Sequence, residues 1–140
     1  MKINLSNSTT LRVRYSETDQ MGYCYYGNYA QYFEVGRVET LRSIGMSYKN
    51  LEERGIMLPV SDFQVSYKTP AKYDDQLTIQ TNIIELKGPR LFFNYTITNK
   101  KNELVATSST TLVFVSKKTR RPTAPPKDFL DLMLPFEVIE

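Results

Sequence analysis

The chain has 140 residues, a formal net charge of +3, 41% hydrophobic residues and 24% charged residues. These values are typical of a globular protein with one hydrophobic core, and the small net charge argues against nucleic acid as a partner. The chain has no histidine and one cysteine, Cys24, which excludes histidine-dependent catalysis, an internal disulfide and zinc sites of histidine or paired cysteines.

No apolar run approaches the roughly 20 residues of a membrane span, and the first residues lack the apolar segment of a signal peptide. We therefore expect a cytoplasmic protein with a single domain over residues 1–140. We expect no membrane span and no metal site.

The first predicted elements are a strand and a turn. Leu11, Val13 and Tyr15 alternate with arginines, which predicts a short strand over residues 10–15. A polar turn follows over residues 16–22. In this turn Asp19 and Gly22 occupy the first and fourth positions that type I turns favour.

A long helix is predicted next, because apolar residues recur at helical spacing from residue 29 to residue 44. Asn28 is the predicted N-cap, Gln31 follows at the spacing of a capping box, and Gly45 ends the helix. Gly36 lies on the apolar side, where glycine costs about 1 kcal/mol relative to alanine. We therefore expect a sheet to approach the helix closely at Gly36.

The sequence after Gly45 predicts a shorter helix over residues 47–54, closed by Gly55, and then four strands. The strands lie near residues 63–67, 77–83, 91–97 and 105–115, with turn signals between them. Consecutive strands with short loops predict an antiparallel meander covered on one face by the long helix. The expected fold class is α+β, with an antiparallel sheet of about five strands wrapped around one long central helix.

One stretch combines a turn carboxylate with the start of the long helix: Tyr15-x-Glu17-Thr18-Asp19-x-x-Gly22-x-x-Tyr25-Tyr26-Gly27-Asn28-Tyr29. A helix start presents unpaired N–H groups, which can hold a developing oxyanion. A carboxylate beside it can attack a carbonyl or activate water. The alternative interpretation is an ordinary turn aspartate with turn glycines, and the residue pattern leaves both open.

The segment from Arg14 to Arg37 resembles the signature of the 4-hydroxybenzoyl-CoA thioesterase family. Members of this family are acyl-CoA thioesterases with the hot-dog fold. A second block, from Val65 to Ile79, resembles the strand pair that follows in that family. The first block matches at Tyr15, Thr18, Asp19, Gly22, Tyr26, Asn28, Tyr29, Phe33, Glu34 and Arg37.

This resemblance implies hydrolysis of an acyl-CoA to a carboxylic acid and coenzyme A. Asp19 matches the catalytic carboxylate, described as nucleophile or general base, and Tyr26 matches the position whose backbone N–H polarises the thioester carbonyl. Gly22, Asn28 and Tyr29 match the substrate-binding part of the motif.

The resemblance also implies an assembly and a binding site for coenzyme A, which enters as part of the substrate and not as a cofactor. Basic residues before the third meander strand contact its phosphates in the family, and here these are Lys87 and Arg90. A homodimer or homotetramer is implied, with active sites at the dimer interface.

Two other functions stay open. A thioesterase acting on acyl carrier protein could use the basic segment from Lys117 to Lys127 to dock an acidic carrier. A binding module could hold an acyl thioester without cleaving it, since fold does not fix function. The sequence does not determine the acyl chain length, the preference for aromatic or aliphatic groups, or the choice between dimer and tetramer.

Overall fold

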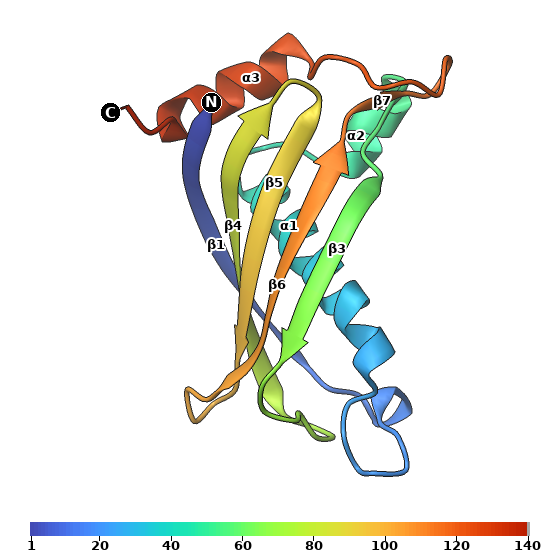
Figure 1. Cartoon of the computed structure of the whole chain (residues 1–140), viewed down its shortest axis with the longest axis vertical. Helices are drawn as coiled ribbons and strands as arrows, with labels where there is room; N and C mark the ends of the chain where they lie inside the picture. Colours follow the sequence, from blue (N-terminus) through green and yellow to red (C-terminus); the bar gives the residue numbers. More distant parts are fainter. Residues whose placement is uncertain (140) are drawn as a thin grey trace.

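The computed structural model describes residues 1–139 and shows a five-stranded antiparallel sheet packed against one long helix (Figure 1). The sheet contains β1 (Lys2–Arg12), β3 (Val60–Tyr67), β4 (Gln76–Lys87), β5 (Arg90–Thr98) and β6 (Leu104–Val113). The helices are α1 (Tyr29–Ser43), α2 (Tyr48–Glu53) and α3 (Lys127–Met133). Short elements are the strands β2 (Ile56–Met57) and β7 (Val115–Ser116) and the 3-10 turns η1 (Tyr15–Glu17), η2 (Tyr26–Asn28) and η3 (Leu134–Phe136). The predicted α+β class and hot-dog arrangement are confirmed.

The strand order is β1-β4-β5-β6-β3. Strands β4, β5 and β6 form the predicted meander, but the expectation that all four later strands are sequential neighbours is wrong. Strand β1 pairs with the free side of β4, so β3 pairs with β6 instead. The connection from β3 to β4 therefore crosses the end of the sheet, and β3 is left as an edge strand.

Strand β1 differs from the strand expected over residues 10–15. It begins at Lys2 and ends at Arg12, because this segment pairs along β4 as far as Glu85. Its middle is rich in serine, threonine and asparagine, so the apolar alternation is too weak to reveal it. Tyr15 lies beyond the strand, in η1, and is exposed.

Helix α1 packs across the inner face of the sheet and is closest to it at Gly36. A Cβ atom added at Gly36 would lie 2.4 Å from Thr81 Oγ1 and 2.9 Å from Ile79 Cγ2. The close approach predicted at this glycine is confirmed. The core around it is formed by fully buried side chains of α1 and the sheet, among them Phe33, Leu41, Leu77, Ile79, Ile83, Leu91, Phe93 and Ile97.

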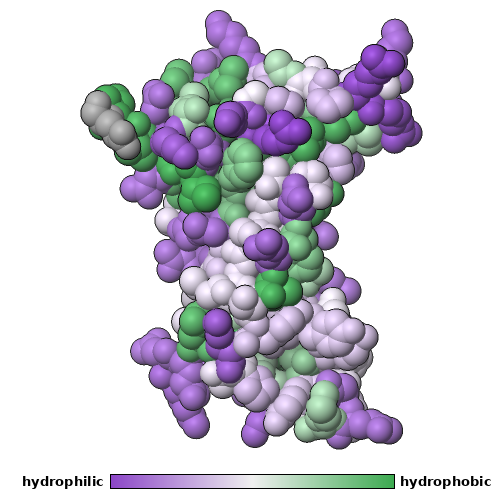
Figure 2. Space-filling model, viewed as in Figure 1, coloured by the Kyte–Doolittle hydropathy of each residue, from purple (hydrophilic) through white to green (hydrophobic). Residues whose placement is uncertain are grey.

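The outer face of the sheet carries two cross-strand rows of uncharged polar residues. Each row crosses all five strands. Figure 2 views the molecule from this side and shows a pale central surface between more hydrophilic ends. One row is Ser6, Asn82, Asn94, Ser109 and Gln64, and the other is Ser8, Gln80, Thr96, Thr107 and Ser66.

The local signals for the short helix are confirmed. Ser47 is the N-cap of α2, and its hydroxyl accepts a hydrogen bond from the Asn50 backbone N–H at 3.1 Å. Gly45 and Gly55 follow the two helices with φ of +88° and +81°, a region that glycine adopts without steric cost.

The two ends of the sheet differ in what covers them (Figure 1). Helix α3 lies across one end, where Phe129 packs on Phe114 with ring centroids 5.0 Å apart. The other end holds the segment before α1, the connection from β3 to β4 and the β5–β6 turn. No helix within residues 1–139 has the length and apolar character needed to cross a membrane.

Candidate active site

Asp19 lies in the predicted turn, at the end of the sheet away from α3. The Gly22 N–H donates to the Asp19 carbonyl oxygen at 3.0 Å, and Gly22 has a φ of +81°, which only glycine adopts readily. Asp19 Oδ1 accepts the backbone N–H groups of Met21 at 2.9 Å and Tyr23 at 3.3 Å. Its Oδ2 accepts no hydrogen bond from any residue that the structure describes, so it is available to a substrate or a water.

Tyr26 begins the helical path that leads into α1. The 3-10 turn η2 starts at Tyr26 and passes directly into the α-helix at Tyr29. Within residues 1–139, the Tyr26 backbone N–H donates to no acceptor, and its side chain is 63% exposed. Together with the positive end of the helix dipole, this N–H can bind a carbonyl oxygen that gains negative charge.

Asn28 connects the start of the helix to the segment that precedes Asp19, a contact that the sequence did not indicate. Its backbone is helical, with φ −76° and ψ −17°, whereas a capping side chain needs an extended backbone. Its side chain therefore makes no cap bond, and the predicted capping box with Gln31 is wrong. Instead, Asn28 Nδ2 donates to the Glu17 carbonyl oxygen at 2.8 Å.

A cavity of about 370 Å³ brings Asp19, Tyr26 and Tyr29 together. Tyr29 packs edge-on against Tyr67 of β3, with ring centroids 5.0 Å apart. Burial raises the pKa of Tyr29 to about 12, so its phenol is neutral at physiological pH. Gly22 and Asn28 shape the surrounding segments but are not among the lining residues, which are Asp19, Met21, Tyr23, Cys24, Tyr26, Tyr29, Tyr67, Lys68, Thr69 and Pro70.

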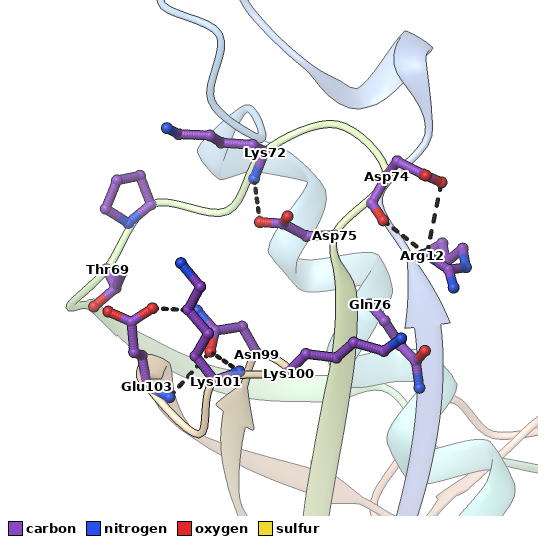
Figure 3. A pocket seen from close by; sticks show the side chains of 11 residues that line it. Arg12, Thr69, Lys72, Asp74, Asp75, Gln76, Asn99, Lys100, Lys101 and Glu103 are labelled. Carbon is purple, nitrogen blue, oxygen red and sulfur yellow. Dashed lines mark hydrogen bonds and ion pairs between the residues drawn. The ribbon is translucent and has the colours of Figure 1, made fainter.

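A second cavity, of about 380 Å³, shares Thr69 and Pro70 with the first but is polar (Figure 3). Arg12 pairs with Asp74 at 3.7 Å, and Asp75 Oδ2 accepts the Lys72 backbone N–H at 2.8 Å. The Asp75 backbone N–H also donates to the Lys72 carbonyl oxygen at 3.1 Å, so this segment forms a turn. It is not a hairpin turn, because β3 and β4 are not neighbours in the sheet. The acids here bind neighbouring cations and amides, and none of the residues that line this cavity is aromatic or begins a helix.

Lys87 and Arg90 lie at the opposite end of the sheet from Asp19 (Figure 1). Strand β4 has 12 residues, and at about 3.3 Å per residue its two ends are roughly 36 Å apart. Within one chain, the structure therefore does not bring these two basic residues to the cavity that contains Asp19.

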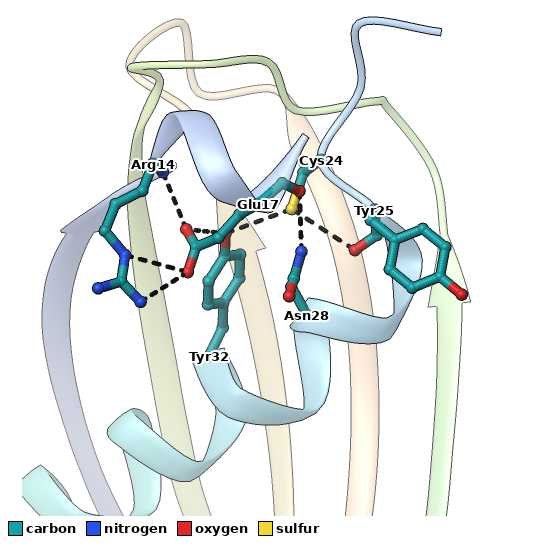
Figure 4. Close-up of polar contacts among 6 residues, drawn as sticks. All are labelled: Arg14, Glu17, Cys24, Tyr25, Asn28 and Tyr32. Carbon is teal, nitrogen blue, oxygen red and sulfur yellow. Dashed lines mark hydrogen bonds and ion pairs between the residues drawn. The ribbon is translucent and has the colours of Figure 1, made fainter. Parts of the chain in front are cut away.

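A buried carboxylate, Glu17, lies in the segment that joins β1 to Asp19 (Figure 4). Its Oε1 accepts the Arg14 backbone N–H at 2.8 Å and the Tyr32 hydroxyl at 2.9 Å. Its Oε2 accepts the Arg14 guanidinium at 3.0 and 3.3 Å. Burial alone would raise the pKa of Glu17, but the hydrogen bonds from Arg14 and Tyr32 outweigh it, and the pKa lies below its ordinary value.

The same cluster fixes the protonation of Cys24. Tyr32 has one hydroxyl hydrogen, and the ionised Glu17 can only accept, so Tyr32 donates to Glu17. The Cys24 sulfur lies 3.2 Å from the Tyr32 oxygen, and it donates to the Tyr25 carbonyl oxygen at 3.7 Å. Burial also raises the pKa of Cys24. Although Cys24 lines the cavity, it is a thiol and not the reactive thiolate.

Sequence reasoning assigned no role to Glu17, Tyr32 or Tyr67. Glu17 and Tyr67 stand inside the two motif blocks, but only the fold shows that one is buried and that the other forms a cavity wall. In the part of the chain described, no three acidic or cysteine side chains gather where they could hold a metal ion.

The chain is similar to known thioesterases in sequence and in fold. Residues 13–132, which include Asp19 and Tyr26, match the thioesterase-like superfamily. A putative acyl-CoA thioesterase of Bacillus subtilis, YneP, is 34% identical over 91% of this chain and 92% of its own. The acyl-CoA thioester hydrolase YbgC of Escherichia coli is 33% identical over 86% of this chain and 90% of its own. The crystal structure of DHNA-CoA thioesterase from Staphylococcus aureus superposes with a TM-score of 0.88 and 35% identity, covering 91% of this chain and 87% of that one.

Proposed function

The chain belongs to the thioesterase-like superfamily, and we propose that it hydrolyses acyl-CoA thioesters, with Asp19 and the Tyr26 backbone N–H as its catalytic groups. One observation carries the assignment of these groups. A carboxylate with an available oxygen and an unpaired N–H at a helix start belong to residues lining one cavity. Acyl transfer needs this pair, a nucleophile or base and a donor for the oxyanion.

In the proposed reaction, the thioester carbonyl oxygen accepts the Tyr26 N–H, and Asp19 Oδ2 acts on the carbonyl carbon or on water. If Asp19 attacks, the thiolate of coenzyme A leaves and a mixed anhydride forms, which water then cleaves. If Asp19 is a general base, it takes a proton from the water that attacks the carbonyl. The C–S bond then breaks, and the thiolate of coenzyme A leaves and takes up a proton. Label found in Asp19 after single-turnover hydrolysis in ¹⁸O-labelled water would establish the first route, because water that cleaves the anhydride at the Asp19 carbonyl leaves its oxygen in Asp19.

We propose that Tyr29 contacts the acyl group, since its ring forms part of the cavity wall. Gly22 and Asn28 contribute to substrate binding indirectly, because they fix the backbone around the cavity. Gly22 sets the turn that presents Asp19, and Asn28 ties the helix start to the segment before it. Coenzyme A enters only as part of the substrate.

The edge strand β3 supports a homodimer. Within residues 1–139 it pairs only with β6, and Phe63 and Tyr67 on it are 43% and 46% exposed. Long edge strands with apolar side chains favour pairing with another strand. Antiparallel pairing of β3 with a second copy would turn that copy end for end. The partner subunit's Lys87 and the partner subunit's Arg90 would then lie toward this cavity, where we propose that they bind the phosphates of coenzyme A.

A homotetramer would use the outer face of the sheet. Its two rows of serine, threonine, asparagine and glutamine carry no charge that would repel an identical face. These side chains both donate and accept hydrogen bonds, so they can pair with a copy of themselves. Sedimentation of the wild type distinguishes dimer from tetramer. The variant Phe63→Glu, which places like charges along the β3 edge, should yield an inactive monomer if the site is shared.

The decisive experiment measures release of the coenzyme A thiol from short, long and aromatic acyl-CoAs. Asp19→Asn keeps the shape of the side chain and removes its charge, and we expect at least a 100-fold loss of kcat. Asp74→Asn is the matched control, because Asp74 is an exposed turn aspartate in the polar cavity, and it should retain wild-type activity. Equal rates for wild type and Asp19→Asn would disprove the catalytic assignment.

If the wild type cleaves no acyl-CoA, acyl carrier protein thioesters are the next substrates to test. Weak inhibition by free coenzyme A would also favour a carrier protein, and binding without cleavage would favour a binding module. We propose a cytoplasmic location, in accord with a single cysteine that remains a free thiol, and cell fractionation tests it.

A further inference from the structure

We infer that Glu17 is a positioning residue of the active site, whose buried carboxylate holds the turn carrying Asp19 in register with the helix start carrying Tyr26. The inference rests on the proposed function, in which those two groups act on the same carbonyl. Glu17 itself is buried and is not among the residues lining the cavity, so it acts through its neighbours and not on the substrate.

The side chain of Glu17 ties two secondary-structure elements together (Figure 4). Two hydrogen bonds from the Arg14 guanidinium and one from its backbone N–H anchor the carboxylate to the segment just after β1. The bond from Tyr32 at 2.9 Å anchors it to the first turn of α1. The carboxylate thus fixes where α1 begins relative to the end of β1.

The backbone of Glu17 ties down both sides of Tyr26. Its carbonyl oxygen accepts the Tyr25 N–H at 2.8 Å and Asn28 Nδ2 at 2.8 Å. These donors come from the residue before Tyr26 and from the last residue of η2. The unpaired Tyr26 N–H therefore lies between two residues whose donors share one acceptor.

The same residue controls the path to Asp19, which follows two positions later. The Asp19 N–H donates to the Tyr23 carbonyl oxygen at 2.9 Å, and Thr18 forms an isolated antiparallel bridge with Cys24. The turn is thus closed on itself and moves as a unit with Glu17. A shift of Glu17 would displace Asp19 relative to the Tyr26 N–H, and a displacement near 1 Å can cost about 100-fold in rate.

Only an ionised carboxylate satisfies all of these donors. Each group around Glu17 donates, namely the Arg14 backbone, its guanidinium and the Tyr32 hydroxyl. In Glu17→Gln, the new NH₂ group faces a donor on at least one side, so that tie is lost while the volume is kept. Tyr32→Phe removes a single tie and leaves the carboxylate with Arg14.

The test compares kcat and KM for acyl-CoA hydrolysis at a temperature well below the unfolding of each variant. We expect Glu17→Gln to lower kcat by about 10- to 100-fold and to change KM by less than about three-fold. Tyr32→Phe should lower kcat by about three- to ten-fold with KM unchanged. Glu39→Gln is the control, because Glu39 pairs with Arg42 on the outer side of α1, and its kcat should equal that of the wild type.

The Asp19→Asn background separates positioning from a purely structural role. Without a working Asp19, the register of its turn no longer affects the residual rate, so adding Glu17→Gln should lower that rate by less than about two-fold. A structural role would lower the rate by the same factor in both backgrounds, and that result would overturn the inference. Unchanged kcat in Glu17→Gln would overturn it as well.

Failure of this inference is distinguishable from failure of the proposed function. An active wild type with unaffected Glu17→Gln and Tyr32→Phe variants would remove only the positioning role. A wild type that cleaves no thioester would remove both. If Glu17→Gln does not fold, Tyr32→Phe decides, and a wild-type kcat in that variant would refute the role of Glu17.

Discussion

The packing at Gly36 gives a prediction whose size follows from the structure. In Gly36→Ala the new Cβ would lie 2.4 Å from Thr81 Oγ1, about 1 Å inside the 3.4 Å limit of ordinary contact. Alanine gains about 1 kcal/mol in helix propensity, whereas overpacking a core costs about 1 to 3 kcal/mol. A clash this deep, between a helix and a buried strand, belongs at the upper end of that range. We therefore expect a net loss of about 1 to 2 kcal/mol in the free energy of unfolding.

The measurement is denaturant unfolding and thermal unfolding, both followed by circular dichroism at one protein concentration, because an oligomer has concentration-dependent stability. A melting temperature about 3 to 10 °C below that of the wild type corresponds to the expected loss for a chain of this size. An increase in stability, as propensity alone would give, would refute the close approach.

A second variant tests the cause of the loss. Thr81→Ala removes the clashing oxygen and leaves Thr81 Cβ 3.8 Å from the new atom. Thr81 Oγ1 has no hydrogen-bond partner among the described residues, so no hydrogen bond is lost with it. Gly36→Ala should therefore cost less in the Thr81→Ala background than in the wild type. Equal costs in both backgrounds would show that Thr81 is not the obstacle.

Three further predictions concern a helix cap, a turn and a buried charge. Ser47→Ala removes the oxygen that accepts the Asn50 N–H at 3.1 Å and should lower the free energy of unfolding by about 1 kcal/mol in urea titrations. Gly22→Ala forces alanine to a φ of +81°, so kcat should fall as Asp19 is displaced, and a wild-type kcat would contradict the role of the turn. The pKa of Glu17 is below its ordinary value of 4.5 in the folded protein, so its ionised form stabilises the fold above about pH 4.5 and this contribution is lost as the pH falls through the folded-state pKa. The stability difference between wild type and Glu17→Gln should thus be largest near pH 7 and shrink in acid, and a pH-independent difference would contradict it.

The sequence determined the features that depend on neighbouring residues. The turn from Asp19 to Gly22, the helix ends at Gly45 and Gly55 and the cap at Ser47 each follow from local steric and hydrogen-bonding preferences. The candidate catalytic pair was also named from the sequence, through the resemblance of residues 14–37 to a thioesterase family signature. The structure adds that both residues line one cavity and that, among the residues it describes, Asp19 Oδ2 and the Tyr26 N–H have no hydrogen-bond partner.

Side-chain partners were decided by the tertiary structure. Asn28 has the chemistry of an N-cap, but the preceding 3-10 turn gives it a helical backbone, and its amide binds Glu17 instead. In the sequence Glu17 is one of several polar residues in a turn, whereas in the structure it is buried and bonded to Arg14 and Tyr32. Local pattern cannot show these outcomes, because the partners come from separate elements.

The sequence also did not predict which strands are neighbours in the sheet. Strand periodicity tells which residues of a strand are buried but not which strand lies beside it. Strand β1 pairs with β4 about 70 residues later in the chain. Strand β3 therefore lies at the edge of the sheet, and β4 runs from one end of the sheet to the other. That arrangement separates Lys87 and Arg90 from Asp19 within one chain and exposes the edge on which a second copy can pair. Local preferences therefore set the elements and the reactive groups, whereas long-range pairing set which of those groups meet.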